Sequence, residues 1–256
     1  MNYMGSKARF LKYILPYLLI YKGVKPYVEI CGGGMNVISE ICGDRTAYDS
    51  NRHLISMWQA LGAGVKFNEN ISRNHYNSVR NSYNKCDGRY SDSYIGWIGY
   101  MASANGRFFE GGYAGISVIK GGGKRDYIAE KIKNIKKQIP KITGVVFKCS
   151  VFQNVNPVAP SIIYCDPPYK GTKQYSKECR NFDYLAYYKW CRKMVSIGHI
   201  IYMSEYEMPD DFVCIWQQKV KSSLSANGKS GSSKSSVEKL FVHKSQLTEK
   251  IKNESA

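Results

Sequence analysis

The chain has 256 residues, of which 43% are hydrophobic and 22% are charged. This length suits one large domain, or a core with one smaller insertion, and the apolar content excludes a wholly disordered chain. Its 37 Lys and Arg outnumber 20 Asp and Glu, which gives a formal net charge of +17. So large an excess of one sign favours a polyanionic partner, above all nucleic acid.

Membranes and metals are not expected as partners. The longest apolar stretch, residues 13–21, is too short to span a bilayer and contains Pro16. The first residues are polar and lack the apolar region and small-residue cleavage site of a secretion signal, so we expect an intracellular protein. The 8 cysteines form no CxxC pair and the 4 histidines show no ligand spacing with them, which predicts reduced thiols and no metal site.

The first quarter of the chain has the pattern that opens a doubly wound α/β fold. The first expected strand runs directly into Gly32, Gly33 and Gly34, and the second ends in Asp49. In chain order, apolar spacing predicts a helix over 8–21, a strand over 26–31, a helix over 37–41, a strand over 45–49 and a helix over 51–61.

The middle of the chain differs in composition. Residues 62–144 are rich in Tyr, Asn, Arg, Lys and Gly, and end in an expected basic helix over 127–139. The sheet pattern then resumes, and residues 225–234 read as a polar, flexible loop. We therefore expect a core of residues 1–61 and 145–256, interrupted by an inserted basic module of residues 62–144. Later strands are expected over 145–147, 161–165, 200–204, 212–216 and 237–242.

The sharpest chemical signal is Asp166-Pro167-Pro168-Tyr169, directly after an apolar strand. Ligands of open α/β sheets bind at the carboxyl ends of strands. Consecutive prolines stiffen the backbone and remove two N–H donors, which leaves carbonyl acceptors. The Asp166 carboxylate and the Pro167 carbonyl can accept the N–H bonds of an exocyclic amine, and Tyr169 can stack on a base. The alternative is a proline turn that merely ends a strand.

The second signal is Glu29-Ile30-Cys31 followed by the glycine run, with Asp49 after the next strand. Glycines let a ligand approach the backbone, and an acid at the end of a second strand suits ribose hydroxyls. Val37 stands where the dinucleotide fingerprint needs its last glycine, and Arg125 stands where a P-loop needs Ser or Thr. A nucleoside without a phosphate chain therefore fits better than NAD or ATP, and an ordinary strand–helix turn remains the alternative.

The order of the motifs resembles one known family. Tyr3-Met4-Gly5-Ser6-Lys7, the glycine run, Ala47-Tyr48-Asp49-Ser50-Asn51 and Asp166-Pro167-Pro168-Tyr169 stand as in Dam-type (D12 class) adenine-specific DNA methyltransferases. Residues 220–228 followed by 237–240 also look like that family's closing hairpin. The resemblance covers nearly the whole chain and is weakest in the middle.

This resemblance implies a class I methyltransferase with a Rossmann-like, doubly wound, mostly parallel sheet and a mainly helical target-recognition module. It implies transfer of a methyl group from S-adenosyl-L-methionine to the N6 amine of an adenine flipped out of double-stranded DNA. The catalytic residues would be Asp166, Pro167, Pro168 and Tyr169. The cofactor would be bound by Tyr3, Lys7, Glu29, Cys31, Gly32, Gly33, Gly34, Asp49, Ser50 and Asp166.

Candidate DNA contacts lie in the middle module. Arg107 is the candidate for reading a guanine edge, because its guanidinium reaches two acceptors there at once, and Asn105 lies beside it. Phe108, Phe109 and Tyr113 are candidates for wedging into the base stack, and plain packing is the alternative. The cations expected to contact phosphates rather than bases are Lys124, Arg125, Lys131 and Lys133.

Two other functions stay open. The same clamp serves any exocyclic amine, so cytosine N4 in DNA or adenine in RNA is an alternative substrate. A catalytically inactive DNA-binding relative is the other, supported by Ile30 and Cys31, where the family usually has Pro-Phe. We expect a monomer or weak dimer, and the short chain suits the cytoplasm of a bacterial or phage-infected cell.

Overall fold

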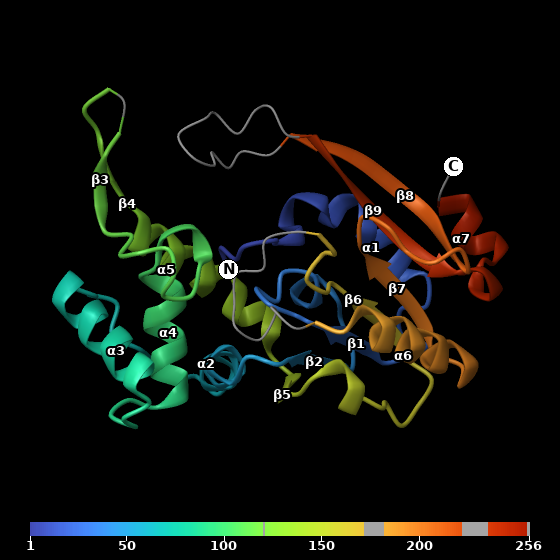
Figure 1. Cartoon of the computed structure of the whole chain (residues 1–256), viewed down its shortest axis with the longest axis horizontal. Coiled ribbons are helices and arrows are strands. Elements are labelled where there is room, and N and C mark those ends of the chain that lie inside the picture. The colour runs from blue at the N-terminus through green and yellow to red at the C-terminus, as the bar shows by residue number, and fades with distance from the viewer. Residues whose placement is uncertain (120, 172–181, 222–234, 255–256) are drawn as a thin grey trace.

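The computed structural model of the chain describes residues 1–119, 121–171, 182–221 and 235–254. The described residues form one seven-stranded sheet in the order β5-β2-β1-β6-β7-β9-β8, and β9 runs antiparallel to both of its neighbours while the others pair in parallel (Figure 1). Its strands are β1 (Tyr27–Ile30), β2 (Arg45–Asp49), β5 (Val145–Cys149), β6 (Ile162–Cys165), β7 (Ile200–Ser204), β8 (Phe212–Lys221) and β9 (Ser235–His243).

The two central strands, β1 and β6, are buried along their whole length. Alternate side chains of these strands enter two different cores, as the twofold period of a strand requires. Tyr27 and Tyr164 belong to one cluster of buried side chains, whereas Ile30 and Ile163 belong to the other. Such burial on both faces is what the mostly parallel arrangement needs, and it confirms the expected α/β class.

The chain changes direction across the sheet between β1 and β6. From β1 it proceeds outward to β2 and β5, and from β6 it proceeds the other way to β7 and the β8–β9 hairpin. Ile30 is paired with Cys165 in the register of these strands. Ligands of open α/β sheets bind at such a switch point, outside the carboxyl ends of the strands.

Helices cover both faces of the sheet. One face packs on α6, whose Tyr187, Trp190 and Met194 are buried in the second cluster. The other face packs on residues of α1, α2, α4 and α5 in the first cluster. The helices are α1 (Leu11–Leu19), α2 (Arg52–Gly62), α3 (Arg73–Lys85), α4 (Asp92–Met101), α5 (Tyr127–Gln138), α6 (Tyr184–Ser196) and α7 (Glu249–Glu254).

Residues 62–144 contribute α3, α4, α5 and a two-stranded hairpin of β3 (Ile116–Val118) and β4 (Lys124–Asp126). Helix α4 packs closely on α2: a Cβ on Gly96 would lie 2.1 Å from the backbone oxygen of His53. One cluster of buried side chains runs from Trp58 on α2 to Ile98 on α4. This segment therefore shares a core with the sheet, and its division from residues 1–61 and 145–256 as a module stays a prediction.

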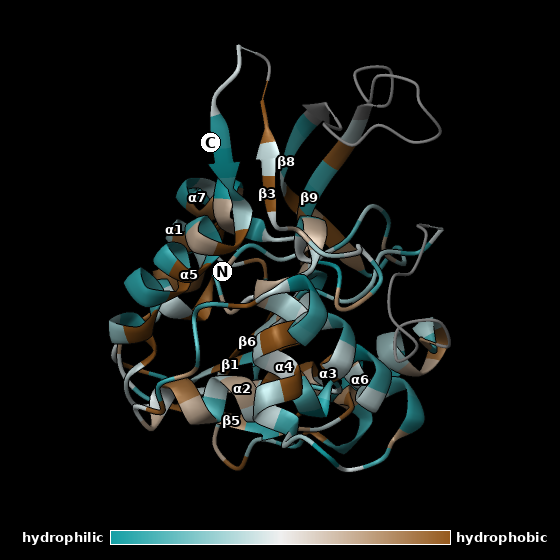
Figure 2. Cartoon of the chain, turned by 90° about the vertical axis from the view of Figure 1, so that its left-hand side faces the viewer, coloured by the Kyte–Doolittle hydropathy of each residue, from teal (hydrophilic) through white to brown (hydrophobic). Residues whose placement is uncertain are grey.

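Two hairpins project from the same side of the molecule. Figures 1 and 2 show β3–β4 and β8–β9 standing side by side above the sheet and helices. Figure 2 also shows apolar positions on β3 that stand clear of the rest of the chain. The side chains of Ile116, Val118 and Ile119 are 65%, 71% and 43% exposed.

One expected element is wrong, and one lies outside the described residues. Residues 37–41 contain only a short 3-10 turn, Ile38–Glu40, rather than a helix. Val37, Ile38 and Ile41 are buried while Glu40 is partly exposed, and one short turn is enough to produce that arrangement. The loop expected at 225–234 lies outside the described residues. The other expected helices and strands are present, with ends that differ by a few residues.

Within the described ranges, none of the helices combines the length and the apolar character needed to cross a bilayer.

Candidate active site

Three motif segments meet at the carboxyl ends of β2, β1 and β6. The amide of Asp166 donates to the carbonyl of Ile30 at 3.2 Å, and the amide of Gly32 donates to the carbonyl of Tyr48 at 3.0 Å. These bonds continue the parallel ladders for one residue beyond the strands. They place the start of the Asp166-Pro167-Pro168-Tyr169 motif beside the glycine run.

Lys7 and Asp166 form an ion pair in which Lys7 Nζ lies 2.7 Å from Asp166 Oδ1. Lys7 belongs to the first turn after the N-terminal segment and is only 6% exposed. The side chain of Asp166 retains 21% exposure, so a ligand can reach it. The structure thus brings together a predicted cofactor contact and the predicted catalytic acid.

Glu238 on β9 completes this cluster. Its Oε1 lies 3.5 Å from Lys7 Nζ and accepts a hydrogen bond from the hydroxyl of Tyr169. Lys7 Nζ also lies 4.6 Å from the centre of the Tyr169 ring, within cation–π range. The rings of Tyr206 and Tyr169 form a T-shaped contact, with 4.7 Å between the ring centres. Tyr169 is therefore fixed both at its hydroxyl and along its ring.

The backbone of the proline motif is also held from outside. The hydroxyl of Tyr184 donates to the carbonyl of Pro168 at 2.8 Å. Beyond the motif, the amide of Lys170 donates to the buried carboxylate of Glu205 at 3.2 Å. Glu205 directly follows β7 and also accepts the amide of Tyr206 at 2.7 Å. These bonds hold the turn in one conformation and engage the second proline carbonyl.

The glycine run is folded against the acid of β2. The amide of Gly33 donates to Asp49 Oδ2 at 3.0 Å, and the amide of Asn51 donates to Asp49 Oδ1 at 2.9 Å. Gly33 has a φ of +50°, and a Cβ there would lie 2.6 Å from the ring of Tyr3. A Cβ on Gly34 would lie 2.7 Å from the Cβ of Tyr3. Glycine is therefore required where the Tyr3 ring closes over this loop.

Two neighbouring positions of the same loop, Cys31 and Gly32, are also constrained by backbone conformation or by close packing. Cys31 is partly buried and has a φ of +58°, a left-handed conformation that is costly for a residue with a Cβ. A Cβ on Gly32 would lie 2.7 Å from the sulfur of Met35, so that glycine too is in close contact. Ser50 is exposed beside Asp49, and its carbonyl receives the thiol of Cys149 at 3.6 Å.

Burial dominates the electrostatics of the acidic groups. It raises the pKa of Asp166 to about 6, although Lys7 acts in the opposite direction. Burial likewise raises the pKa of Glu29 to about 8 and that of Glu205 to about 7. For Lys7, burial lowers the pKa, but the carboxylates of Asp166 and Glu238 outweigh it and the net shift is upward. At neutral pH Glu29 therefore keeps its proton, while Lys7 and Asp166 are ionised.

The candidate DNA contacts lie in two parts of the structure, the loop that carries Asn105 and Arg107 and the segment that carries Lys124 and Arg125. The loop that carries Asn105 and Arg107 lies against the N-terminal segment, because a Cβ on Gly106 would be 2.8 Å from the carbonyl oxygen of Asn2. Asn105 is exposed and Arg107 is partly exposed. This loop therefore borders the segment that carries Tyr3.

The candidate wedge residues are packed in the described conformation. Phe108 is half-buried, with its ring 5.0 Å from that of Tyr100, and Phe109 is buried. The hydroxyl of Tyr113 donates to the carbonyl of Ile71 at 2.6 Å. Insertion of these rings between bases stays a prediction, and it would require the loop to leave this packing.

The candidate phosphate contacts differ among themselves. Lys124 and Arg125 lie on β4 of the projecting hairpin, which stands away from β6 (Figure 1). Arg125 pairs with Glu130 through two bonds of 2.7 and 2.8 Å. Lys131 is buried, and its ammonium donates to the carbonyls of Tyr100 and Ser103. This burial is at odds with the expected phosphate contact, because the Lys131 ammonium is bound to these two carbonyls inside the protein.

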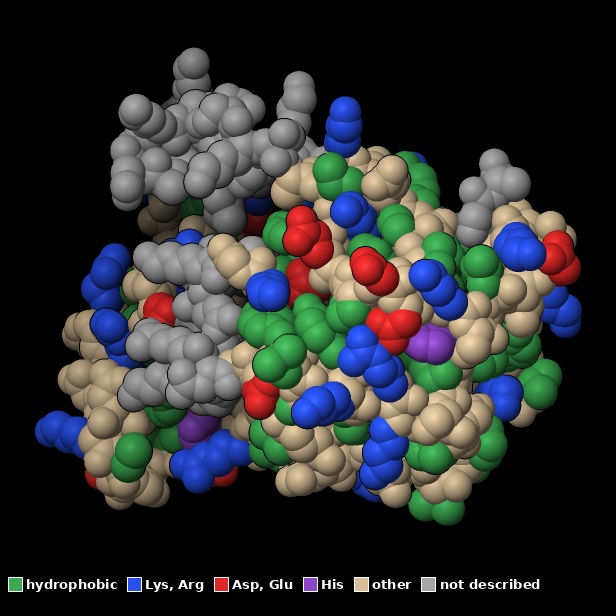
Figure 3. All heavy atoms as spheres, turned by 45° about the vertical axis from the view of Figure 1, so that its right-hand side comes forward, with side chains coloured by type: hydrophobic (Ala, Val, Ile, Leu, Met, Phe, Trp, Pro, Cys, Tyr) green, Lys and Arg blue, Asp and Glu red, His purple; other side chains and the backbone are tan. Residues whose placement is uncertain are grey.

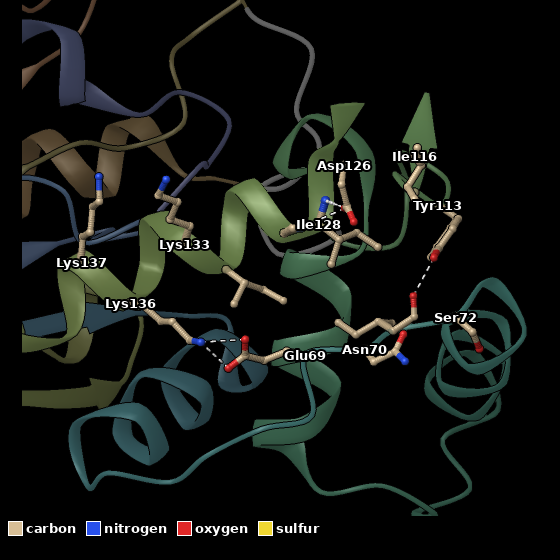
Figure 4. A pocket seen from close by; sticks show the side chains of 14 residues that line it. Glu69, Asn70, Ser72, Tyr113, Ile116, Asp126, Ile128, Lys133, Lys136 and Lys137 are labelled. Carbon is tan, nitrogen blue, oxygen red and sulfur yellow. Dashed lines mark hydrogen bonds and ion pairs between the residues drawn. The ribbon is translucent and has the colours of Figure 1, made fainter. Parts of the chain in front are cut away.

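A groove of about 620 Å³ lies beside α5, apart from the cluster around Asp166. Figure 4 shows Lys133 and Lys137 extending from α5 along it, whereas Lys136 turns to Glu69, 2.6 Å away. Tyr113 and Ile116 line its other end, so the groove leads to the base of the β3–β4 hairpin (Figure 4).

Glu238, Glu205 and Tyr184 were not identified as site residues from the sequence. Tyr184 and Glu238 bond to motif residues that lie 16 and 69 residues away along the chain, and Glu205 bonds to the next residue after the motif, 35 residues away. Local spacing carries no trace of such contacts. The one available signal was an acid, Glu238, inside an apolar run that was expected to form a strand.

Comparison with known proteins identifies the relationship. The model of the D12 class N6 adenine-specific DNA methyltransferase family matches residues 3–190. The comparison with curated proteins found no match. Among solved structures, a crystal structure of a candidate methylase from Haemophilus influenzae has 8% sequence identity, with 93% of this chain and 99% of that chain covered and a TM-score of 0.33. Within the described residues, no group of His, Cys, Asp and Glu is placed to hold a metal ion.

Proposed function

Because the chain belongs to the D12 class N6 adenine-specific DNA methyltransferase family, we propose that it transfers a methyl group from S-adenosylmethionine to the N6 amine of adenine in double-stranded DNA. The observation that carries this proposal is the Asp166 carboxylate. It is held at the carboxyl end of β6, paired with a buried lysine and still partly exposed to a ligand. Action in the cytoplasm as a monomer or weak dimer belongs to the same proposal.

The residues at the strand ends suit a nucleoside cofactor. Asp49 accepts two backbone amides and, as a carboxylate, has further lone pairs for ribose hydroxyls. The glycine run beside it has no side chains to block a ligand, and Gly33 and Gly34 are buried beneath the Tyr3 ring, which forms a wall over that run. Tyr3, Gly33 and Asp49 would therefore hold S-adenosylmethionine, whose sulfonium supplies an electrophilic methyl group. Cys31 offers less apolar contact than an aromatic ring would at this position.

Asp166 and the backbone of Pro167 would prepare the amine. The lone pair of an aromatic amine is delocalised into the ring, so the amine is a weak nucleophile. The Asp166 carboxylate accepts one N–H and the Pro167 carbonyl accepts the other, which favours a pyramidal nitrogen whose lone pair points at the methyl group. The Pro168 carbonyl is bound to Tyr184 instead. The gain comes from positioning and from fixed acceptors in a partly buried site.

Tyr169 would hold the target base. An adenine in a duplex is out of reach, so it must leave the stack at a cost of a few kcal/mol. Stacking on the Tyr169 ring offsets part of that cost. The ring is held by Glu238 at its hydroxyl and by a T-shaped contact with Tyr206, so little side-chain entropy is lost on binding.

The two projecting hairpins would both contact the DNA. The β3–β4 hairpin exposes Ile116, Val118 and Ile119 next to Lys124, a combination suited to a DNA groove, where apolar side chains meet bases and cations meet phosphates. The basic groove along α5 continues from the foot of this hairpin. Both features lie in the segment of residues 62–144, which supports its role in target recognition.

The decisive test is methyl transfer from labelled S-adenosylmethionine to unmethylated duplex DNA, with nucleoside analysis of the product. We expect N6-methyladenine from the wild type and a loss of roughly a hundredfold or more in Asp166→Asn, which keeps the size of the side chain but removes its charge. Asp210→Asn, on the exposed connection before β8, is the matched control and should retain activity. N4-methylcytosine as the product, or transfer to RNA alone, would replace adenine in DNA as the substrate.

A further inference from the structure

Glu238 lies outside the part of the chain that matches the family model, which ends at residue 190. It is nevertheless 7% exposed and its carboxylate meets two groups of the candidate active site. The same oxygen, Oε1, accepts the hydroxyl of Tyr169 and lies 3.5 Å from Lys7 Nζ. A carboxylate is costly to bury unless it is paired, so the burial of Glu238 on β9 needs an explanation.

Lys7 lies between two carboxylates. Its ammonium is 2.7 Å from Asp166, 3.5 Å from Glu238 and 3.2 Å from the carbonyl of Gly5. In the described state Lys7 engages the oxygen of Asp166 that faces it. An amine that approaches Asp166 through Oδ1 therefore competes with Lys7 for that oxygen.

The second carboxylate removes the penalty of that competition. If Lys7 withdrew from Asp166 without another anion nearby, it would become an unpaired buried ammonium, which is strongly unfavourable. Glu238 is close enough to accept Lys7 after a small movement of its flexible side chain. The total charge of the cluster does not change, because one ion pair replaces another and no proton moves.

On the premise of the function proposed above, we propose that Glu238 is a positioning residue for methyl transfer, which receives Lys7 when an exocyclic amine binds Asp166 and holds Tyr169 against the base. Glu238 touches neither the methyl group nor the amine in this scheme. It acts through Lys7 and Tyr169. The β8–β9 hairpin thereby has a part in catalysis as well as in closing the sheet.

The first experiment compares Glu238→Gln and Glu238→Asp with the wild type in single-turnover methyl transfer, with KM for S-adenosylmethionine and duplex affinity measured in parallel. Glutamine can still accept the Tyr169 hydroxyl but offers Lys7 no charge. We expect the rate of Glu238→Gln to fall about tenfold or more, with the KM and the duplex affinity changed less than about twofold. Aspartate restores the charge and should recover part of the rate. Glu249→Gln, an exposed glutamate on α7, is the matched control and should keep the wild-type rate.

The second experiment needs no catalysis. A carbon-13 NMR titration of the Asp166 carboxyl, assigned with Asp166→Asn, reports its pKa in the cofactor-free protein. The Glu238 charge raises this pKa and Lys7 lowers it, so Glu238→Gln should lower the pKa of Asp166, because the repulsion from Glu238 is lost and Lys7 pairs with Asp166 alone. The other ionisable groups that influence Asp166 or are influenced by it are Tyr169, Tyr164, Cys165, Glu29 and Glu205.

The two experiments separate the proposals. If the wild type methylates DNA while Glu238→Gln keeps both the wild-type rate and the wild-type Asp166 pKa, the role of Glu238 is refuted and the proposed function stands. If the Asp166 pKa falls in Glu238→Gln but the wild type transfers no methyl group to any nucleic acid, the function is refuted and only the electrostatic coupling of the two carboxylates is confirmed. A fall in rate matched by an equal rise in the KM for S-adenosylmethionine would overturn the positioning role in favour of cofactor binding.

Discussion

Glu29 is the clearest case of a residue whose surroundings reverse its ordinary charge state. It lies on β1, buried on both sides, and its Oε2 accepts the hydroxyl of Tyr27 at 3.2 Å. Burial raises its pKa from 4.5 to about 8, and the nearby charge of Asp166 adds to the rise. The folded protein therefore retains a proton on Glu29 that the unfolded chain has released once the pH exceeds 4.5.

This proton links stability to pH. Between pH 4.5 and about 8 the folded state binds more protons than the unfolded state at this site, so the contribution of Glu29 to the free energy of unfolding falls as the pH rises. The change is at most about 1.4 kcal/mol per pH unit. Glutamine never ionises, so Glu29→Gln should raise the free energy of unfolding over the wild type by a margin that grows from pH 5 to pH 8.5.

Urea unfolding at a series of pH values measures that margin. Glu249→Gln, exposed on α7, controls for the exchange of a glutamate at a surface site. A margin for Glu29→Gln that stays constant across the series would show that Glu29 is ionised in the folded protein, and would contradict the assignment.

Among the helices and strands, the packing of α4 against α2 joins residues 62–144 to the core of the sheet. The two helices approach so closely that Gly96 has no room for a side chain: a Cβ would lie 2.1 Å from the backbone oxygen of His53 and 2.9 Å from the Cβ of Met57. Backbone cannot move aside as a side-chain tip can. We therefore expect Gly96→Ala to lower the free energy of unfolding by about 1–3 kcal/mol, as overpacking does.

Gly62, the last residue of α2, provides the matched control. A Cβ there would meet only the ring of Phe147, at 3.8 Å, which is an ordinary contact. Gly62→Ala should therefore be neutral or raise stability by up to roughly 1 kcal/mol, because alanine favours a helix more than glycine does. Thermal unfolding of both variants tests the argument. Equal melting temperatures would mean that α2 and α4 are not in the close contact described.

The elements differ in how far the sequence predicts them. The expected strands at 45–49 and 200–204 match the observed bounds, because local sequence patterns encode both strands. Residues 37–41 do not form the expected helix, because so short an apolar run fits a buried turn equally well. The direction of β9 and its place between β7 and β8 follow from packing over the whole sheet, which local patterns do not contain.

The same distinction applies to the site. The Asp166 motif and the glycine run were predictable, because each has its chemistry in consecutive residues. Their pairing with Lys7 and Glu238 was not, because it joins the N-terminal segment to β6 and β9. A buried ion network is specified by which strand ends meet. The fold must therefore be known before the network can be written down.

At the scale of the whole molecule, charge governs the encounter with DNA. The net charge is +17, and Figure 3 shows Lys and Arg side chains spread over the visible face, with acidic side chains among them. A general positive field of this kind attracts DNA without choosing a sequence. Position on the molecule must then decide which cations contact phosphates, and the projecting β3–β4 hairpin is the favoured place.

Salt dependence distinguishes the hairpin from the general field. Each phosphate contact contributes about 0.9 to the slope of log affinity against log salt concentration, so we expect a steep slope for the wild type over about 50 to 200 mM salt. Lys124→Ala should reduce the slope by about one unit, whereas Lys252→Ala should leave it unchanged. Lys252 is a lysine on α7, at the other end of the molecule (Figure 1), and it pairs with Glu249 at 2.6 Å.

Fluorescence anisotropy with a labelled duplex measures both slopes. Equal slopes for Lys124→Ala and the wild type would remove the hairpin from the DNA interface and leave the groove along α5 as the site of phosphate contact.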